Sequence, residues 1–221
     1  MFRLHLNKTD LQWEEVAPMK YKRGLFGAAV FNNGLVVCGG RDDTKRFSVC
    51  ESYEIARNKW KKISFMIQCR TGHATATSGG SLYSMGGFNG NYFLSTVERL
   101  DGLDQSWKFV SSMQTSRSLF AAVTCDDVIY AIGGSQNKNE TLKSVEKYNC
   151  AADKWSYVSD MTFKRYSHSA CVMHGRIFVV GGRNENNEPV KEIESYDPLA
   201  DKWKIVARSD NELFFSSLAV L

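Results

Sequence analysis

Short apolar runs alternate with turn residues along the whole chain, and the runs have the length and composition of β-strands. Within residues 114–159, the small and apolar run 119–124 leads into Asp126-Asp127, and the β-branched run 128–132 then ends at Gly133-Gly134. A polar stretch, an alternating segment at 144–148, a turn at 149–154 and a last run at 155–158 complete the unit. Four short strands at intervals of 8–12 residues are typical of all-β proteins. No segment of helical length shows a 3.6-residue period.

This four-strand pattern repeats through the sequence. The five tryptophans, at positions 13, 60, 107, 155 and 203, are separated by 47, 47, 48 and 48 residues. The same spacing governs Gly-Gly pairs that begin at 39, 86, 133 and 181, and arginines at 23, 70, 117 and 165. Each of the last four tryptophans has a Glu nine residues before it and a Tyr seven before it, except that Leu100 takes the Tyr place in the second unit. The repeats therefore span about 20–64, 67–111, 114–159 and 162–207.

The repeat length identifies the architecture. Four strands in each 47–48 residues predict one blade of a β-propeller. Glycine pairs at the end of the second strand permit close approach of backbones, and the Trp and Tyr side chains supply apolar area between neighbouring blades. The one extra residue of the third and fourth units falls between the Gly pair and the Glu, which predicts a surface loop there.

The repeated Arg, the Gly-Gly pairs, the Tyr and the Trp resemble the kelch repeat. Segments such as VEKYNCAADKW and IESYDPLADKW are most similar to the kelch region of BTB-BACK-kelch proteins. The resemblance implies an all-β fold, a kelch β-propeller in which residues 1–221 form one domain with four complete four-stranded blades.

A partial blade is expected from the two ends, residues 1–17 and 212–221. Leu4, Leu6 and Trp13 stand in the Glu, Tyr and Trp places of a preceding unit, and Leu213 stands where the repeated Arg is expected. Similar proteins mostly have six blades, or about 285 residues at this period. We therefore expect a chain shortened at its N-terminal side; a five-bladed ring and the pairing of two copies are the alternatives.

Composition narrows the class of protein further. A net charge of +4, spread along the chain, does not predict nucleic-acid binding, and no apolar run approaches the 18 residues of a membrane span. The N-terminus lacks the apolar region of a secretory signal. Six cysteines without a CxxC pair then predict reduced thiols in a cytoplasmic protein.

Catalytic motifs are absent from the sequence. No nucleophile elbow, phosphate loop, zinc-protease or dinucleotide-binding motif occurs. His73 and His168 take equivalent places, but Phe26 and Phe120 fill that place in the other units, which favours a packing role over a metal site. We expect no enzyme, no catalytic residue, no metal and no cofactor.

Protein binding is the better prediction, because a propeller presents loops on which functional residues gather. In similar propellers, partner peptides dock on the loops between second and third strands and on the segments that precede the first strands. Carried over by position, the candidate residues are Arg41, Arg46, Phe88, Asn89, Tyr92, Phe93, Gln136, Asn137, Arg183 and Asn184, with Tyr21, Lys22, Lys164 and Tyr166 beside them. Arg23, Arg70, Arg117 and Arg165 have two interpretations of equal weight: partner contact, or an internal ion pair with the repeated Glu.

The resemblance implies a substrate-recognition propeller related to the adaptors of cullin-RING ubiquitin ligases, with a protein substrate or an acidic or phosphorylated peptide degron as ligand. No BTB or BACK domain fits in this sequence, so contact with the ligase would be indirect only. An actin-binding kelch protein is the alternative function.

Overall fold

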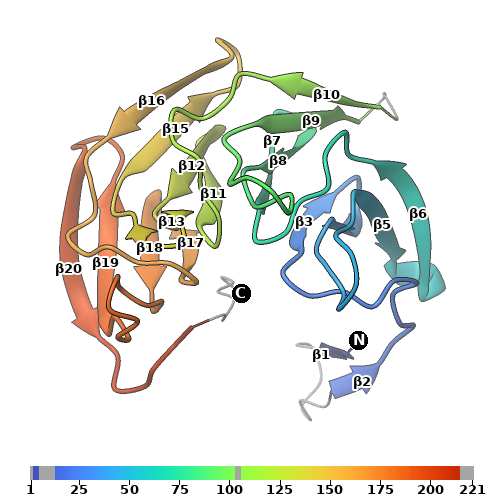
Figure 1. The fold of residues 1–221 in the computed structure, drawn as a ribbon, viewed down its shortest axis with the longest axis horizontal. Coiled ribbons are helices and arrows are strands. Elements are labelled where there is room, and N and C mark those ends of the chain that lie inside the picture. The colour runs from blue at the N-terminus through green and yellow to red at the C-terminus, as the bar shows by residue number, and fades with distance from the viewer. Residues whose placement is uncertain (1, 5–12, 103–105, 215–221) are drawn as a thin grey trace.

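The structure is a computed structural model, and it describes residues 2–4, 13–102 and 106–214. Four antiparallel four-stranded sheets, here called blades 1 to 4, follow one another around an arc with their first strands innermost (Figure 1). Blade 1 consists of β3 (Gly27–Phe31), β4 (Gly34–Cys38), β5 (Val49–Glu54) and β6 (Lys59–Phe65). Blade 2 consists of β7 (Ala74–Ser78), β8 (Ser81–Met85), β9 (Val97–Asp101) and β10 (Trp107–Val110). Blade 3 consists of β11 (Ala121–Cys125), β12 (Val128–Ile132), β15 (Val145–Asn149) and β16 (Lys154–Val158). Blade 4 consists of β17 (Ser169–Met173), β18 (Arg176–Val180), β19 (Glu192–Asp197) and β20 (Lys202–Arg208). The all-β expectation and the count of complete blades are confirmed.

Three small elements complete the secondary structure of the described residues. A hairpin of β13 (Ser135–Asn137) and β14 (Glu140–Thr141) forms in the loop of blade 3, which the sequence predicts only as polar. A single 3₁₀ turn, η1 (Ile55–Arg57), joins β5 to β6, and β1 (Phe2–Leu4) pairs with β2 (Trp13–Glu15).

The N-terminal pair of strands differs in register from the sequence prediction. Leu4 lies opposite Trp13, as Tyr53 lies opposite Trp60 in blade 1. Leu4 therefore takes the Tyr place rather than the Glu place, because the connection between the two strands is two residues longer than in a complete blade. Leu6 lies outside the described residues.

At the C-terminal end, Leu213 behaves as the sequence predicts. The backbone N–H of Gly182 donates to the carbonyl of Leu213 at 2.6 Å, as the N–H of Gly134 donates to Arg165 at 2.9 Å. Leu213 thus occupies the Arg place of a further unit, while the rest of the expected first strand, residues 215–221, lies outside the described residues.

The glycine pairs are required where neighbouring blades meet. Gly86 and Gly87 have φ values of +61° and +91°. A Cβ atom at Gly86 would lie 2.5 Å from the Arg117 carbonyl of the next blade, and one at Gly87 would lie 2.7 Å from the His73 Cβ. Both the backbone conformation and the contacts exclude a side chain, which explains why the pair recurs in every blade.

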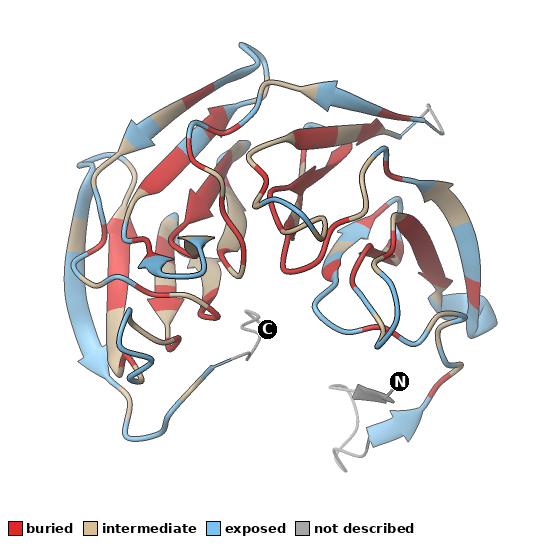
Figure 2. Cartoon of the chain, in the orientation of Figure 1, coloured by how far each residue is buried: buried red, intermediate tan, exposed pale blue. Residues whose placement is uncertain are grey.

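Buried apolar side chains between the blades form the core. Figure 2 shows that the outermost strands β6 and β20 are largely exposed, whereas buried residues gather on the strands inside them. Between blades 2 and 3, Trp155 stacks on Tyr148 with ring centroids 4.9 Å apart, and its indole N–H donates to the Ser111 carbonyl at 2.9 Å. The Tyr148 hydroxyl donates to Asp153, whose same oxygen accepts the Ser111 N–H. The repeated Trp and Tyr therefore join adjacent blades, as their spacing predicts.

A belt of backbone hydrogen bonds links the inner ends of the blades. Gly72 donates its N–H to the Leu25 carbonyl at 2.9 Å, Leu119 to Gly72 at 2.7 Å, and Ser167 to Leu119 at 2.8 Å. The three non-glycine residues of this belt have φ values between 53° and 54°, in the left-handed region. The strained conformation points the N–H of one residue at the carbonyl of the residue in the preceding blade. Each of the three interfaces between blades 1 to 4 therefore has one such hydrogen bond.

Candidate functional site

The loop face consists of the connections between the second and third strands of each blade and the segments that precede the first strands. In blade 1, Arg41 forms backbone bridges with both Gly24 and Arg46. Phe88 is bridged in the same way to Thr71 and Phe93 in blade 2, and residues 135 and 183 form the corresponding bridges in blades 3 and 4. The loops are therefore fixed to the blades by backbone hydrogen bonds, and their outward side chains project from a defined frame.

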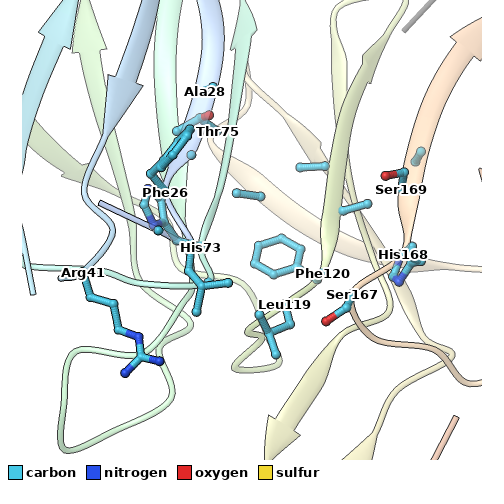
Figure 3. A pocket seen from close by; sticks show the side chains of 18 residues that line it. Phe26, Ala28, Arg41, His73, Thr75, Leu119, Phe120, Ser167, His168 and Ser169 are labelled. Atoms are coloured by element: carbon cyan, nitrogen blue, oxygen red, sulfur yellow. The ribbon is translucent and has the colours of Figure 1, made fainter. Parts of the chain in front are cut away.

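Blade 1 places five basic side chains on this face. Lys20, Lys22, Arg41 and Lys45 are exposed, and Arg46 is half-buried. Arg41 also reaches the rim of the central cavity (Figure 3). This set is called the basic cluster below.

The acidic residues of the same loop reduce its positive charge only in part. Asp42 accepts the backbone N–H groups of Thr44 at 2.8 Å and Lys45 at 2.7 Å. These hydrogen bonds lower the pKa of Asp42 and hold its carboxylate in the turn. With Asp43 as the other acid of the loop, five cations face two carboxylates, and the blade 1 corner of the face carries net positive charge.

An aromatic group lies beside the basic cluster, on blade 2. The Arg46 guanidinium lies 5.0 Å from the ring centroid of Phe88, and Phe88 contacts Phe93 at 5.2 Å. Arg46 thus joins the loops of two blades through a cation–π contact. Tyr92 stands free, with 70% of its surface exposed.

The predicted asparagines shape the loops. Asn89 accepts the N–H groups of residues 91 and 92 with its side-chain oxygen, and Asn137 accepts that of residue 139. Asn184 accepts from residues 186 and 188 and donates to the Glu188 carboxylate. Gln136 is half-buried, and its carbonyl accepts the Ser116 hydroxyl at 3.3 Å. These side-chain bonds are typical of Asx turns, so the first role of these asparagines is to hold loop conformation.

Arg183 holds the blade 4 loop against the chain that follows β20. Its guanidinium donates to the Asn187 carbonyl at 2.5 Å and lies 4.4 Å from the ring centroid of Phe214. Arg183 is half-buried, so it is less free to meet a partner than Arg41.

The four repeated arginines lie inside the blades, and the structure shows the internal ion pair. Arg70, Arg117 and Arg165 are 0% exposed, and the Arg23 side chain is also fully covered. The ion pairs Arg23–Glu51, Arg70–Glu98, Arg117–Glu146 and Arg165–Glu194 have N···O distances of 2.7, 2.9, 3.0 and 2.6 Å. Direct partner contact by these four guanidinium groups, the other interpretation, is therefore corrected: they are covered and already bonded within their blades.

The central cavity, with a volume of about 810 Å³, is lined by the first strands and the belt residues (Figure 3). His73 is buried at its edge, and its ring would lie 2.7 Å from a Cβ atom placed on Gly39; Phe120 meets Gly86 in the same way. Burial, reinforced by the neighbouring arginines, lowers the pKa of both His73 and His168 to about 3, so both rings are neutral at physiological pH. These contacts agree with the packing role. The described residues contain no cluster of three or more His, Cys, Asp or Glu side chains placed to hold a metal ion.

Lys20 is a member of the basic cluster that the repeat pattern does not predict. The equivalent positions of the later blades hold Ile67, Gln114 and Thr162. The sequence feature that could have pointed to Lys20 is a charge that occurs in the first unit only, at a position that varies among the repeats. On the loop face of this chain, the exposed charges stand at positions that vary between the repeats, whereas the repeated arginines are buried.

Comparison with known proteins places this architecture. The kelch motif matches residues 22–66, 69–114, 116–162 and 164–208, most of the chain. The chain belongs to the kelch-repeat family. Kelch repeats generally form protein-binding modules. Within the described residues of this kelch chain, no helix is long and apolar enough to cross a membrane.

Individual relatives cover this kelch chain only in part. Kelch-like protein 40 of Xenopus tropicalis is 33% identical over 82 residues, which are 37% of this chain and 13% of the relative. Kelch-like protein 40 of Mus musculus is 40% identical over 77 residues, 35% of this chain and 12% of that protein. Beta-scruin of Limulus polyphemus is 40% identical over 88 residues, 39% of this chain and 9% of that protein. The chain thus spans a small fraction of the curated relatives it matches.

A solved structure supports the kelch fold independently. The protein in "Structure of YjhT" superposes with a TM-score of 0.88 at 16% sequence identity, covering 98% of this chain and 80% of that one. At this identity the likeness concerns the fold alone.

Proposed function

We propose that the loop face recognises an acidic or phosphorylated segment of a partner protein, and that the basic cluster of blade 1 is the anchoring part of the site. The observation that carries the proposal is Arg41. It is exposed, its backbone is bridged on both sides, and no hydrogen bond or ion pair involves its side chain within the described part of the chain. An exposed guanidinium on a fixed backbone, with no internal partner, can bind a carboxylate or phosphate with two parallel hydrogen bonds.

The surroundings of Arg41 support this choice of ligand. Lys22 and Lys45 add long-range attraction for an anion, and Tyr92 adds an exposed ring of the kind that contributes strongly to protein interfaces. The cavity beside Arg41 allows one side chain of a bound peptide to enter the centre of the arc. A peptide that crosses from blade 1 to blade 2 would contact all of these groups.

The resemblance to kelch-like proteins carries the finer proposal. We propose that this chain is a substrate-recognition propeller related to cullin-RING ligase adaptors, and that further subunits or domains supply contact with the ligase. An acidic actin filament is the second candidate partner, because the same basic cluster would attract it.

Peptide binding tests the proposal. A panel of fluorescent peptides with acidic, phosphoserine and neutral sequences is titrated into the wild-type chain, Arg41→Ala, Arg183→Ala and the control Lys204→Ala, whose side chain lies on outer strand β20. Arg41→Ala should weaken an acidic or phosphorylated ligand about tenfold, as loss of about 1.4 kcal/mol predicts, and Arg183→Ala should weaken it less. Equal affinities for wild type and both loop variants would refute the proposal.

Sedimentation with actin filaments separates the two candidate partners. Co-pelleting that fades with salt and with Arg41→Ala would favour the filament; peptide binding without co-pelleting would favour the adaptor role.

A further inference from the structure

One tip of the loop face carries a hydroxyl group, and this tip lies inside the basic cluster. The tips of the loops in blades 2, 3 and 4, residues 89–92, 136–140 and 184–188, contain no Ser or Thr. The corresponding tip of blade 1, residues 42–45, contains Thr44, which is exposed. A hydroxyl is therefore available at the same corner of the face that anchors the proposed ligand.

The spacing between Arg41 and Thr44 is that of a protein kinase substrate. Kinases that prefer basic substrates commonly select an arginine three residues before the hydroxyl that they modify. Arg41 is the only arginine of the sequence that has a Ser or Thr three residues after it. The single match thus falls on the exposed tip of the loop that carries the proposed binding site.

The hydrogen bonds of the loop make its tip easier to open than its base. At the base, the backbone of Arg41 is bridged on both sides. At the tip, the Thr44 hydroxyl donates to the Asp42 carboxylate at 2.8 Å, and so do two backbone N–H groups. The Asp42 N–H donates to the Lys45 carbonyl at 3.0 Å. Exposed hydrogen bonds within four consecutive residues are exchanged for water at low cost, so a kinase can reach the hydroxyl without disrupting the blade.

From these observations we propose that Thr44 is a phosphorylation site, and that its phosphate blocks the binding of an acidic partner to the basic cluster. This regulation rests on the proposed function of the loop face. In the transfer, the Thr44 oxygen bonds to the γ-phosphorus of ATP, and the bond from that phosphorus to its bridging oxygen breaks. ADP leaves, and the catalytic Asp of the kinase accepts the hydroxyl proton. The turn loses the hydrogen bond of the hydroxyl to Asp42 and keeps the two from the backbone N–H groups.

The charges of this corner decide the direction of the effect. Its five cations and two carboxylates give a net charge of +3. A phosphothreonine dianion lowers that charge to about +1 and presents three acceptor oxygens to its neighbours. Repulsion by Asp42 and Asp43 directs the phosphate toward Arg41 and Lys45. A phosphate bound at Arg41 then competes with the carboxylate of a partner for the same two parallel hydrogen bonds.

Treatment with a protein kinase tests the modification. The wild-type chain and the control Thr44→Ala are incubated with ATP and the catalytic subunit of cyclic-AMP-dependent protein kinase, and the products are mapped by mass spectrometry. The wild-type chain should gain one phosphate on the peptide that contains Thr44, and Thr44→Ala should gain none there. A folded chain left unmodified at Thr44 under conditions that phosphorylate a free peptide of residues 38–49 would overturn the inference.

Peptide binding tests the regulation. The affinity of an acidic peptide without hydroxyl groups is measured by fluorescence anisotropy for the phosphorylated and the untreated chain. Phosphorylation should weaken binding at least about tenfold, and phosphatase treatment should restore it. Thr44→Ala taken through the same steps should keep the wild-type affinity. The matched control Lys204→Glu changes the net charge by the same two units on outer strand β20, and its affinity should stay within about twofold of wild type.

Failure of this inference can be distinguished from failure of the proposed function. If the untreated chain binds no acidic peptide, the proposed function is wrong, and the regulation that rests on it is wrong as well. If the untreated and phosphorylated chains bind equally well, the proposed function stands and the regulation alone is wrong. An equal loss of affinity in Lys204→Glu would show that overall charge sets the affinity, and it would also overturn the inference.

Discussion

The buried ion pair of blade 3 offers the sharpest test of how the blades are held together. The Arg117 guanidinium donates to the carbonyls of Gly133 at 3.0 Å and Ser144 at 2.7 Å, and to the Glu146 carboxylate at 3.2 and 3.0 Å. The other carboxylate oxygen accepts the backbone N–H of Gln114 at 2.7 Å. One guanidinium thus connects the segment before β11 to the end of β12 and to β15.

Substitution Arg117→Ala leaves Glu146 charged and 0% exposed. Removing one partner of a buried pair costs about 3 to 5 kcal/mol, and two carbonyls also lose their donors at about 1 kcal/mol each. The backbone N–H groups that remain on Glu146 and water entering the vacated space offset part of this loss. We expect a net loss of about 4 kcal/mol, a large fraction of the 5 to 15 kcal/mol typical of folded domains.

Urea unfolding followed by tryptophan fluorescence measures the loss. The midpoint for Arg117→Ala should fall by about 1 to 2 M. The control Arg57→Ala removes a guanidinium whose ion pair with Glu54 lies on the surface, and it should cost less than about 1 kcal/mol. Replacing Arg117 and Glu146 together by Leu should recover much of the stability. A midpoint for Arg117→Ala within experimental error of Arg57→Ala would refute this account of the ion pairs.

Three other outcomes follow from the packing between blades. The pKa of His73 and His168 falls from 6.5 in the unfolded chain to about 3 in the fold, so their contribution to stability is complete above pH 6.5 and is lost as the pH falls toward 3. The loss amounts to about 4 to 5 kcal/mol of unfolding free energy per histidine at pH 3. Urea unfolding between pH 7 and 4 should show that the free energy of unfolding falls less steeply with pH when both histidines are replaced by Phe. An equally steep fall in the double variant would contradict this account. Tyr148→Phe should cost about 1 kcal/mol in urea unfolding by removing the hydrogen bond to Asp153, with no effect on peptide binding. Gly134→Ala should lower the melting temperature strongly, because φ is +92° and the new Cβ would lie 2.5 Å from another Cβ; a melting temperature equal to wild type would contradict the steric argument.

The repeat allowed the fold to be predicted because each repeated residue has one physical task in every blade. The glycine pairs have left-handed φ values, and the tryptophans join adjacent blades, as their spacing indicates. The register of β1 with β2 could not be predicted, since a connection two residues longer moves Leu4 rather than Leu6 opposite Trp13. The length of this connection could not be predicted, because the later units of the repeat all have a shorter one.

The candidate site was predictable in position but not in detail. The loops that carry Arg41 and Tyr92 follow directly from the place of the Gly pairs. The sequence could not decide whether the repeated arginines contact a partner or form internal ion pairs, because the direction of their side chains depends on how the strands and the preceding segments pack. Leu100 departs from the repeated Tyr, which the sequence shows. That it lies with Val36 beside a cavity between blades 1 and 2 could be seen only in the structure.

The belt formed by Leu25, Gly72, Leu119 and Ser167 consists of main-chain atoms alone. Its geometry therefore does not depend on which side chains the neighbouring loops present. Loop residues can therefore change during evolution while the spacing of the blades beneath them stays the same. A chain of this kind can acquire a new binding partner without a change of fold.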